Sequence, residues 1–156
     1  MPTKIIGAKI GSDAAEIVVL TRDDSGNFTL EEQTTMKLQK GERPAAYDIL
    51  HGEFSDFIKH QKVKTVCIKG STVSMGGTKL VHLHAAELRG VVQAAAASAR
   101  TEVRIMTKAA ASRNFGTRKV DEYLKDDSFW AGQNLTTLKK GLREAAFAVI
   151  SEFPKP

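Results

Sequence analysis

Apolar residues follow strand spacing at the start of the chain and helix spacing further on, a pattern that predicts an α/β fold. Three segments near the N-terminus have the composition of strands: Lys4–Ile10, Glu16–Leu20 and Phe28–Leu38. The turn signals between them are Gly11-Ser12-Asp13 and Asp23-Asp24-Ser25-Gly26-Asn27, whose residues cap the backbone or accept a positive φ. The third segment alternates, which places on one side the apolar residues Phe28, Leu30, Met36 and Leu38. Its other side is polar, as expected of an antiparallel strand at the edge of a sheet.

Helices and strands alternate in the rest of the chain. Apolar residues recur at helical spacing after Pro44, which the first turn of a helix tolerates. The pattern then predicts a fully apolar strand at Thr65–Ile68, an Ala-rich helix at about Val81–Ala99 and a strand at Val103–Met106. A short helix ends at Ser112–Gly116, and the charged segment Arg118–Asp127 follows it. A last helix is predicted from the spacing of Leu135, Leu138, Leu142, Ala145, Val149 and Phe153. This order predicts a sheet with helices on its faces, in one domain over residues 1–156, because no repeat or linker is visible.

The composition is that of a globular protein with a basic surface. Lys and Arg total 23 against 18 Asp and Glu, which gives a formal net charge of +5. Such a surface favours polyanionic partners such as nucleic acid. The one cysteine, Cys67, lies in an apolar run, so we expect it to be buried and to form no disulfide within the chain. The apolar start is too short for a signal peptide and no run reaches membrane-spanning length, so we expect a cytoplasmic protein with no membrane partner.

Several segments carry a family resemblance. The first, Ile5-Ile6-Gly7-Ala8-Lys9-Ile10-Gly11-Ser12, places apolar residues around a glycine and ends in a Gly-Ser turn. Four more agree in position: Val66-Cys67-Ile68-Lys69, Leu88-Arg89-Gly90-Val91-Val92, Val103-Arg104-Ile105-Met106-Thr107-Lys108 and Arg143-Glu144-Ala145-Ala146-Phe147-Ala148. Together these segments resemble RuvC-type Holliday junction resolvases of the RNase H-like superfamily, and small bacterial RNase H-like proteins of unknown function. The resemblance implies a bacterial protein with a mixed five-stranded sheet, three antiparallel strands followed by two parallel ones, and helices on both faces.

The metal-binding carboxylates of these nucleases are missing from the positions that the resemblance assigns to them. Such enzymes hold two divalent metal ions with three or four acidic side chains. Here Lys9 stands at the first-strand Asp position and Lys69 at the fourth-strand Glu position, while the paired acidic positions of the last helix hold Gly141 and Glu144. An ammonium group repels a metal ion, and one Glu does not assemble a two-metal centre. We therefore expect a pseudoenzyme with no metal and no cofactor, whose two lysines either attract phosphate or simply reach solvent.

Two other groups of residues give weaker signals. The loop Gly70–Lys79 lies between a strand and a helix, where an anion cradle belongs, but its spacing is not that of a Walker loop. We interpret it as a connection or as a loop that touches phosphates, since Ser71, Ser74 and Thr78 have no neighbouring His or Asp for hydrolase chemistry. His82 and His84 lie two apart in a predicted helix, so they point away from each other, which argues against a metal site.

Basic residues gather towards the C-terminal end of the chain. Lys139 and Arg143 lie four apart in the predicted last helix, with no matching acid between them. Phe115, Phe129 and Trp130 offer surfaces for stacking on bases, although for Trp130 we favour an anchoring role in the core. The candidate nucleic-acid-binding residues are Lys9, Lys69, Lys79, Arg89, Lys108, Arg113, Arg118, Lys119, Lys139, Lys140 and Arg143.

Three functional hypotheses follow. The first is a non-catalytic RNase H-like protein that binds DNA or RNA through the basic rim around Lys9 and Lys69. The second is an interaction module that forms a homo-oligomer through the sheet edge at Thr29–Lys37 or through an apolar helix face. The third is a metal-dependent nuclease whose carboxylates are the residual acids Asp13, Glu87 and Glu144. Binding that weakens steeply with salt distinguishes the first hypothesis from the second, and metal-dependent cleavage identifies the third.

Overall fold

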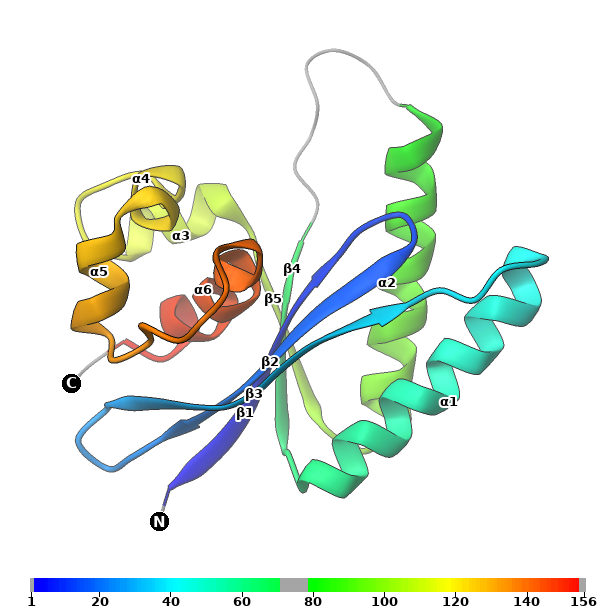
Figure 1. The fold of residues 1–156 in the computed structure, drawn as a ribbon, viewed down its shortest axis with the longest axis horizontal. Coiled ribbons are helices and arrows are strands. Elements are labelled where there is room, and N and C mark those ends of the chain that lie inside the picture. The colour runs from blue at the N-terminus through cyan, green and yellow to red at the C-terminus, as the bar shows by residue number, and fades with distance from the viewer. Residues whose placement is uncertain (1, 71–78, 155–156) are drawn as a thin grey trace.

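One mixed sheet of five strands forms the centre of the molecule and confirms the predicted fold class. The computed structural model describes residues 2–70 and 79–154. The strands are β1 (Thr3–Ile10), β2 (Ala14–Arg22), β3 (Phe28–Lys37), β4 (Thr65–Lys69) and β5 (Glu102–Met106), in the spatial order β3-β2-β1-β4-β5 (Figure 1). β1, β2 and β3 pair antiparallel, whereas β4 runs parallel to both β1 and β5. This is the sheet of three antiparallel and two parallel strands that the resemblance implied, and β3 lies at its edge as predicted.

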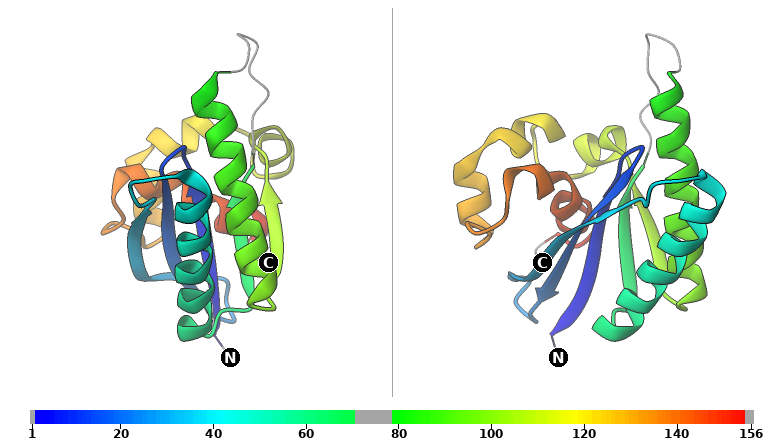
Figure 2. Two further views of the ribbon diagram at one scale, coloured as in Figure 1. Left: turned by 90° about the vertical axis from the view of Figure 1, so that its right-hand side faces the viewer. Right: turned by 45° about the vertical axis from the view of Figure 1, so that its right-hand side comes forward.

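Helices cover both faces of the sheet. α1 (Arg43–Gln61) and α2 (Leu80–Ser98) lie on one face. The other face carries α6 (Arg143–Glu152), preceded by the shorter helices α3 (Lys108–Asn114), α4 (Val120–Lys125) and α5 (Asp127–Gly132) and the 3-10 turn Lys140–Leu142. The turned views in Figure 2 show the two groups of helices on opposite sides of the strands. In the described part of the chain, no helix combines the length and hydropathy that crossing a membrane requires.

The pleat of the strands divides the interior into two hydrophobic cores. In β1, Ile6 and Ala8 face the core under α1 and α2, whereas Ile5 faces the core under α6. Cys67 of β4 belongs to the α6 core and is fully buried, as predicted, and burial raises the pKa of its thiol to about 12. Trp130 is also buried there and donates a hydrogen bond from Nε1 to the carbonyl oxygen of Tyr123 at 2.9 Å, which confirms its anchoring role.

β3 does not keep its apolar residues on one side, so that part of the prediction is wrong. Leu20 pairs with Leu30 and the neighbouring Val19 pairs with Glu32, which leaves Glu31 as an extra residue in a β-bulge. The extra residue reverses the alternation of side chains. Phe28 and Leu30 therefore pack into the α6 core, while Met36 and Leu38 pack against the core under α1 and α2.

The predicted last helix is also shorter than its apolar spacing suggested. Leu135 and Leu138 are buried, but they lie in turns ahead of α6 rather than in a helix. The amide of Gln33 in β3 holds these turns, since its Nε2 donates to the Thr137 carbonyl oxygen at 3.0 Å and its Oε1 accepts from the Lys139 amide at 2.9 Å. These contacts occupy backbone groups that a continuous helix would pair internally. Lys139 and Arg143 therefore do not share one helix face.

α6 packs on β1 at Gly7. A Cβ on this residue would overlap the backbone carbonyl oxygen of Ala145 and crowd a methyl group of Val149. Glycine thus lets the helix backbone come directly onto the strand. The close approach fixes the first turn of α6 beside the carboxyl ends of β1 and β4, where the candidate site lies.

Candidate functional site

Lys9 and Lys69 lie on neighbouring strands at the same edge of the sheet. The last paired residues of β1 and β4 are Ala8 and Ile68, and each is followed directly by one of the two lysines. Ala8 and Ile68 point into the core under α1 and α2. Because side chains alternate along a strand, both lysines belong to the opposite face, the one that carries α6. The two lysines therefore lie at adjacent strand ends, as a shared basic rim around Lys9 and Lys69 requires.

Glu144, in the first turn of α6, lies between two ammonium groups. Its Oε2 is 3.3 Å from Nζ of Lys69, and its Oε1 is 3.5 Å from Nζ of Lys108. The three side chains are mostly buried, with exposed fractions of 18% for Lys69, 22% for Glu144 and 27% for Lys108. Lys108 also donates a hydrogen bond of 2.9 Å to Oδ1 of Asp121 in α4. We refer to Lys69, Lys108, Asp121 and Glu144 as the edge cluster.

The charges of the edge cluster stabilise one another. Partial burial opposes the charge on Lys108 more than any other single influence, but the hydrogen bond to Asp121 and the charge of Glu144 together raise its pKa. The same hydrogen bond is the main reason that the pKa of Asp121 lies below its ordinary value. Both groups are therefore charged at neutral pH, and the pair stays ionised.

Lys9 has a carboxylate partner of its own on the neighbouring strand. Glu16 lies opposite Lys9 in the antiparallel register of β1 and β2, and its Oε2 is 3.9 Å from the Lys9 Nζ. The edge thus brings three lysines next to three carboxylates rather than forming an uncompensated basic patch. Sequence analysis named the lysines and Glu144 but missed Glu16 and Asp121. A lysine at or just beyond the end of each of the three neighbouring strands β1, β4 and β5 was the available signal for the cluster.

The residual acids do not combine into a metal centre. Asp13 pairs with Arg43 at 3.0 Å, and this hydrogen bond lowers the Asp13 pKa. Glu87 accepts a hydrogen bond of 3.1 Å from the Tyr47 hydroxyl, which in turn accepts one of 2.8 Å from Arg43 Nε. Across residues 2–70 and 79–154, no three His, Cys, Asp or Glu side chains come together in a way that could hold a metal ion. The third hypothesis therefore finds no ligand set in this part of the chain.

Two of the predicted basic residues are tied into the fold. Arg143 bonds Asp127 at 2.7 Å and the Leu124 carbonyl oxygen at 3.0 Å, so its acidic partner comes from outside the segment between Lys139 and Arg143. Arg118 bonds Asp126 at 3.0 Å and lies over the Tyr123 ring. Lys140 lies 4.0 Å from the same oxygen of Asp127, and Arg89 is half-buried with an Nη1 contact of 3.4 Å to the Ala85 carbonyl oxygen. Phe115 and Phe129, considered as base-stacking surfaces, pack against the α6 core.

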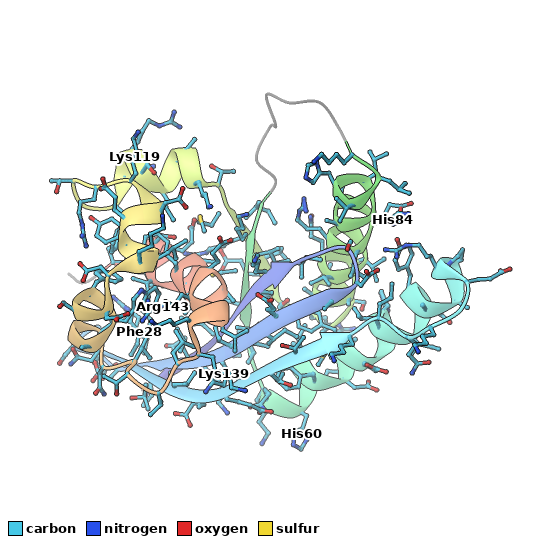
Figure 3. All side chains as sticks on the ribbon, turned by 45° about the horizontal axis from the view of Figure 1, so that its top comes forward. Phe28, His60, His84, Lys119, Lys139 and Arg143 are labelled. Atoms are coloured by element: carbon cyan, nitrogen blue, oxygen red, sulfur yellow. The ribbon has the colours of Figure 1, made fainter. Side chains whose placement is uncertain are left out.

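The remaining basic residues are exposed but do not form one patch. Among the described residues, no acid forms an ion pair with the side chains of Lys79, Arg113, Lys119 and Lys139. Lys119 immediately precedes α4 and Lys79 immediately precedes α2, so these two flank the edge cluster from opposite sides of the sheet. Figure 3 shows Lys119 on one side and His84 of α2 on the other, whereas Lys139 lies apart beside β3. The loop residues Ser71, Ser74 and Thr78 lie outside the described residues.

Comparison with known proteins identifies the fold. The sequence matches no protein-family model and no curated protein. Among solved structures, RuvC from Thermus thermophilus superposes with a TM-score of 0.73 at 13% identity, covering 99% of each chain. The T. thermophilus RuvC in complex with a Holliday junction substrate superposes with a TM-score of 0.67 at 12% identity, covering 97% of this chain and 90% of that chain. For the yeast mitochondrial Holliday junction resolvase Ydc2 the TM-score is 0.62 at 9% identity, covering 97% and 77%. The chain therefore has the RNase H-like fold in the form found in RuvC-type Holliday junction resolvases.

Proposed function

We propose that this chain is a non-catalytic RNase H-like protein that binds nucleic acid at the edge formed by the carboxyl ends of β1, β4 and β5. The observation that carries the proposal is the placement of the lysines Lys9, Lys69 and Lys108 at this one edge. The resemblance assigns metal-binding carboxylates to two of these positions. The lysines therefore put fixed positive charges at the place where the related nucleases hold metal ions.

The chemistry of the edge cluster argues against metal-dependent cleavage. Hard divalent cations such as magnesium take oxygen ligands, and an ammonium group offers none. Glu144 is the one carboxylate at a position that the resemblance assigns to the metal site, and each of its oxygens already faces a lysine. A metal ion at Glu144 would have to approach two positive charges at close range, which Coulomb repulsion disfavours.

The surroundings of the edge favour a phosphate backbone as the ligand. Exposed Lys79 and Lys119 flank the edge from α2 and α4, so positive charge extends beyond the paired lysines. Each phosphate that a cation neutralises releases condensed counterions, which drives binding and makes it dependent on salt. The T. thermophilus RuvC structure with a Holliday junction substrate supports branched DNA as the first ligand to test.

Fluorescence anisotropy with labelled four-way junction DNA, duplex DNA and RNA, at two salt concentrations and in EDTA, tests the proposal. We expect binding without metal, and we expect Lys9→Gln plus Lys69→Gln to weaken it by about tenfold or more with a shallower salt dependence. The matched control is Lys59→Gln plus Lys64→Gln. These exposed lysines lie near the last residue of α1 and the first residue of β4, at the end of β4 opposite to Lys69. Equal affinities in the two double variants would contradict the proposal, as would binding that EDTA abolishes.

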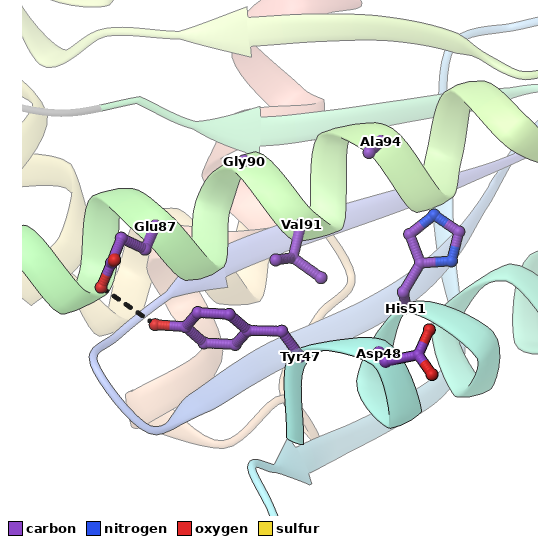
Figure 4. Close-up of a pocket in the computed structure, with 7 residues that line it drawn as sticks. All are labelled: Tyr47, Asp48, His51, Glu87, Gly90, Val91 and Ala94. Carbon is purple, nitrogen blue, oxygen red and sulfur yellow. Dashed lines mark hydrogen bonds between the residues drawn. The ribbon is translucent and has the colours of Figure 1, made fainter. Parts of the chain in front are cut away.

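The α1–α2 face supports self-association as a second candidate function. The large apolar side chains left exposed among the described residues are Ile49, Leu80, Val81, Leu83 and Ile105, and all but the last belong to these two helices. A groove of about 510 Å³ runs between the helices, with Tyr47, Asp48 and His51 on α1 facing Glu87, Gly90, Val91 and Ala94 on α2 (Figure 4). Exposed apolar side chains on the same two helices as an open groove favour an interaction surface there.

A further inference from the structure

We propose that Glu144 is an internal substitute for phosphate, which occupies the space between Lys69 and Lys108 and is displaced when a phosphodiester binds. The inference rests on the proposed nucleic-acid-binding function and adds a regulatory feature to the same site. In the free protein the carboxylate neutralises the lysines. Bound nucleic acid would take the place of this carboxylate, so competition from Glu144 lowers the affinity of the protein for nucleic acid.

The shape of the contact supports this assignment. One carboxylate presents two oxygens, and each oxygen faces a different ammonium group, with Oε2 at 3.3 Å from Lys69 and Oε1 at 3.5 Å from Lys108. A phosphodiester likewise carries one negative charge shared between two non-bridging oxygens on one phosphorus atom. The two lysines are therefore already spaced to receive a pair of oxygens from a single anionic group.

The contacts that hold Glu144 are of a kind that a competitor can replace. Its Oε2 is buried and accepts no hydrogen bond from any described residue, so charge alone holds it near Lys69. The contrast within the edge cluster is Asp121, which accepts a hydrogen bond of 2.9 Å from Lys108. Among the described residues Lys69 forms no ion pair with a second carboxylate, although the charge of Lys69 also acts on Asp121, so displacement of Glu144 frees its ammonium group from its ion-pair partner.

Displacement would not leave the carboxylate in an unfavourable place. Glu144 lies in the first turn of α6, where the helix dipole stabilises a negative charge. Its side chain is 22% exposed, so part of it already lies at the surface although Oε2 is buried. The folded structure thus tolerates both arrangements, with Glu144 on the lysines or turned towards solvent.

Replacement of the carboxylate by an amide of the same shape tests the inference. With four-way junction DNA in EDTA, we expect Glu144→Gln to bind about fivefold to tenfold more tightly than the unmodified protein, because the lysines no longer carry a competing anion. The slope of log affinity against log salt should steepen by about one phosphate contact. Glu53→Gln, which removes an exposed charge from α1, is the control for net charge and should change affinity by less than about twofold.

A double-mutant cycle separates displacement from a general charge effect. In a Lys69→Gln plus Lys108→Gln background, Glu144→Gln should no longer raise affinity, since the groups that it competes for are gone. In the unmodified protein, the NMR signal of the Glu144 carboxylate carbon should shift when the DNA is added. If the unmodified protein binds and Glu144→Gln binds no more tightly, the inference is wrong while the proposed function stands. If neither protein binds any of the nucleic acids, the proposed function fails and the inference fails with it.

Discussion

The ion pair between Lys108 and Asp121 makes the stability of the fold depend on pH. The pKa of Asp121 is lowered from 3.8 by its hydrogen bond to Lys108. The pKa of Lys108 is raised from 10.5, because the two carboxylates outweigh the opposing effect of burial. A carboxylate whose pKa is lower in the folded than in the unfolded protein stabilises the fold at pH values above its unfolded pKa. This stabilisation is lost as the pH falls through the folded pKa. A lysine whose pKa is higher in the folded than in the unfolded protein stabilises the fold at pH values below its unfolded pKa of 10.5. This stabilisation is lost as the pH rises through the folded pKa.

We therefore expect the pair to contribute between about pH 4 and pH 10 and to fade on either side. Asp121→Asn should lower the free energy of unfolding by about 0.5 kcal/mol or less at pH 7, because the Asp121 side chain is 66% exposed and solvent screens the pair. Urea denaturation at pH 7 and pH 3 measures the difference. The difference should be smaller at pH 3, and an undiminished difference there would show that the substitution acts through something other than this pair.

Contacts between whole elements depend on a few positions that allow close approach. α6 reaches β1 because Gly7 has no side chain, and this approach places Glu144 next to Lys69. We expect Gly7→Ala to lower the free energy of unfolding by about 2–3 kcal/mol, since the new methyl group meets helix backbone that cannot move aside cheaply.

Gly52 provides the matched control for Gly7→Ala. It lies within α1, and a Cβ there would have no neighbour within 4 Å. Gly52→Ala should therefore raise stability by about 0.5–1 kcal/mol, because alanine has the higher helix propensity. Chemical denaturation of the two variants gives both values. Equal effects would mean that the α6–β1 contact is looser than the structure indicates.

At the scale of the whole molecule, the two functional candidates use opposite sides of the sheet. The edge cluster belongs to the α6 side, while the exposed apolar residues of α1 and α2 lie on the other. Self-association through α1 and α2 predicts a dimer that persists at high salt, because burial of apolar surface drives it. Leu83→Asp should convert that dimer to a monomer in sedimentation equilibrium, while Lys69→Gln should leave it intact. A protein that is monomeric at every concentration tested would contradict this second candidate.

Local patterns in the sequence were enough for the five strands, for α1 and α2 and for their order, whereas α4 and α5 were not predicted. The apolar β4 run, Pro44 at the start of α1 and the turn at Asp23–Asn27 each reflect short-range preferences, and all appear in the structure. Features that depend on distant contacts were not predictable in this way. The bulge at Glu31 depends on pairing with β2, and the start of the last helix depends on Gln33. Lys9 and Lys69 were found because the resemblance assigns carboxylates to their positions, and Lys108 because it is one of the basic residues late in the chain. Their partners were missed, because the pairing of Glu16 depends on the exact register of β1 and β2 and that of Asp121 on the placement of α4.

The contact between Lys69 and Glu144 also constrains how a sequence of this kind can change over generations. Lys69→Glu alone would put a second carboxylate beside Glu144 and leave Lys108 as the nearest cation to both. Lys9→Asp alone would place a second acid opposite Glu16. Each of these single substitutions therefore exchanges an existing lysine–carboxylate pair for a contact between two acids. The pairing favours retention of both lysines, because neither can change to an acid without placing like charges together.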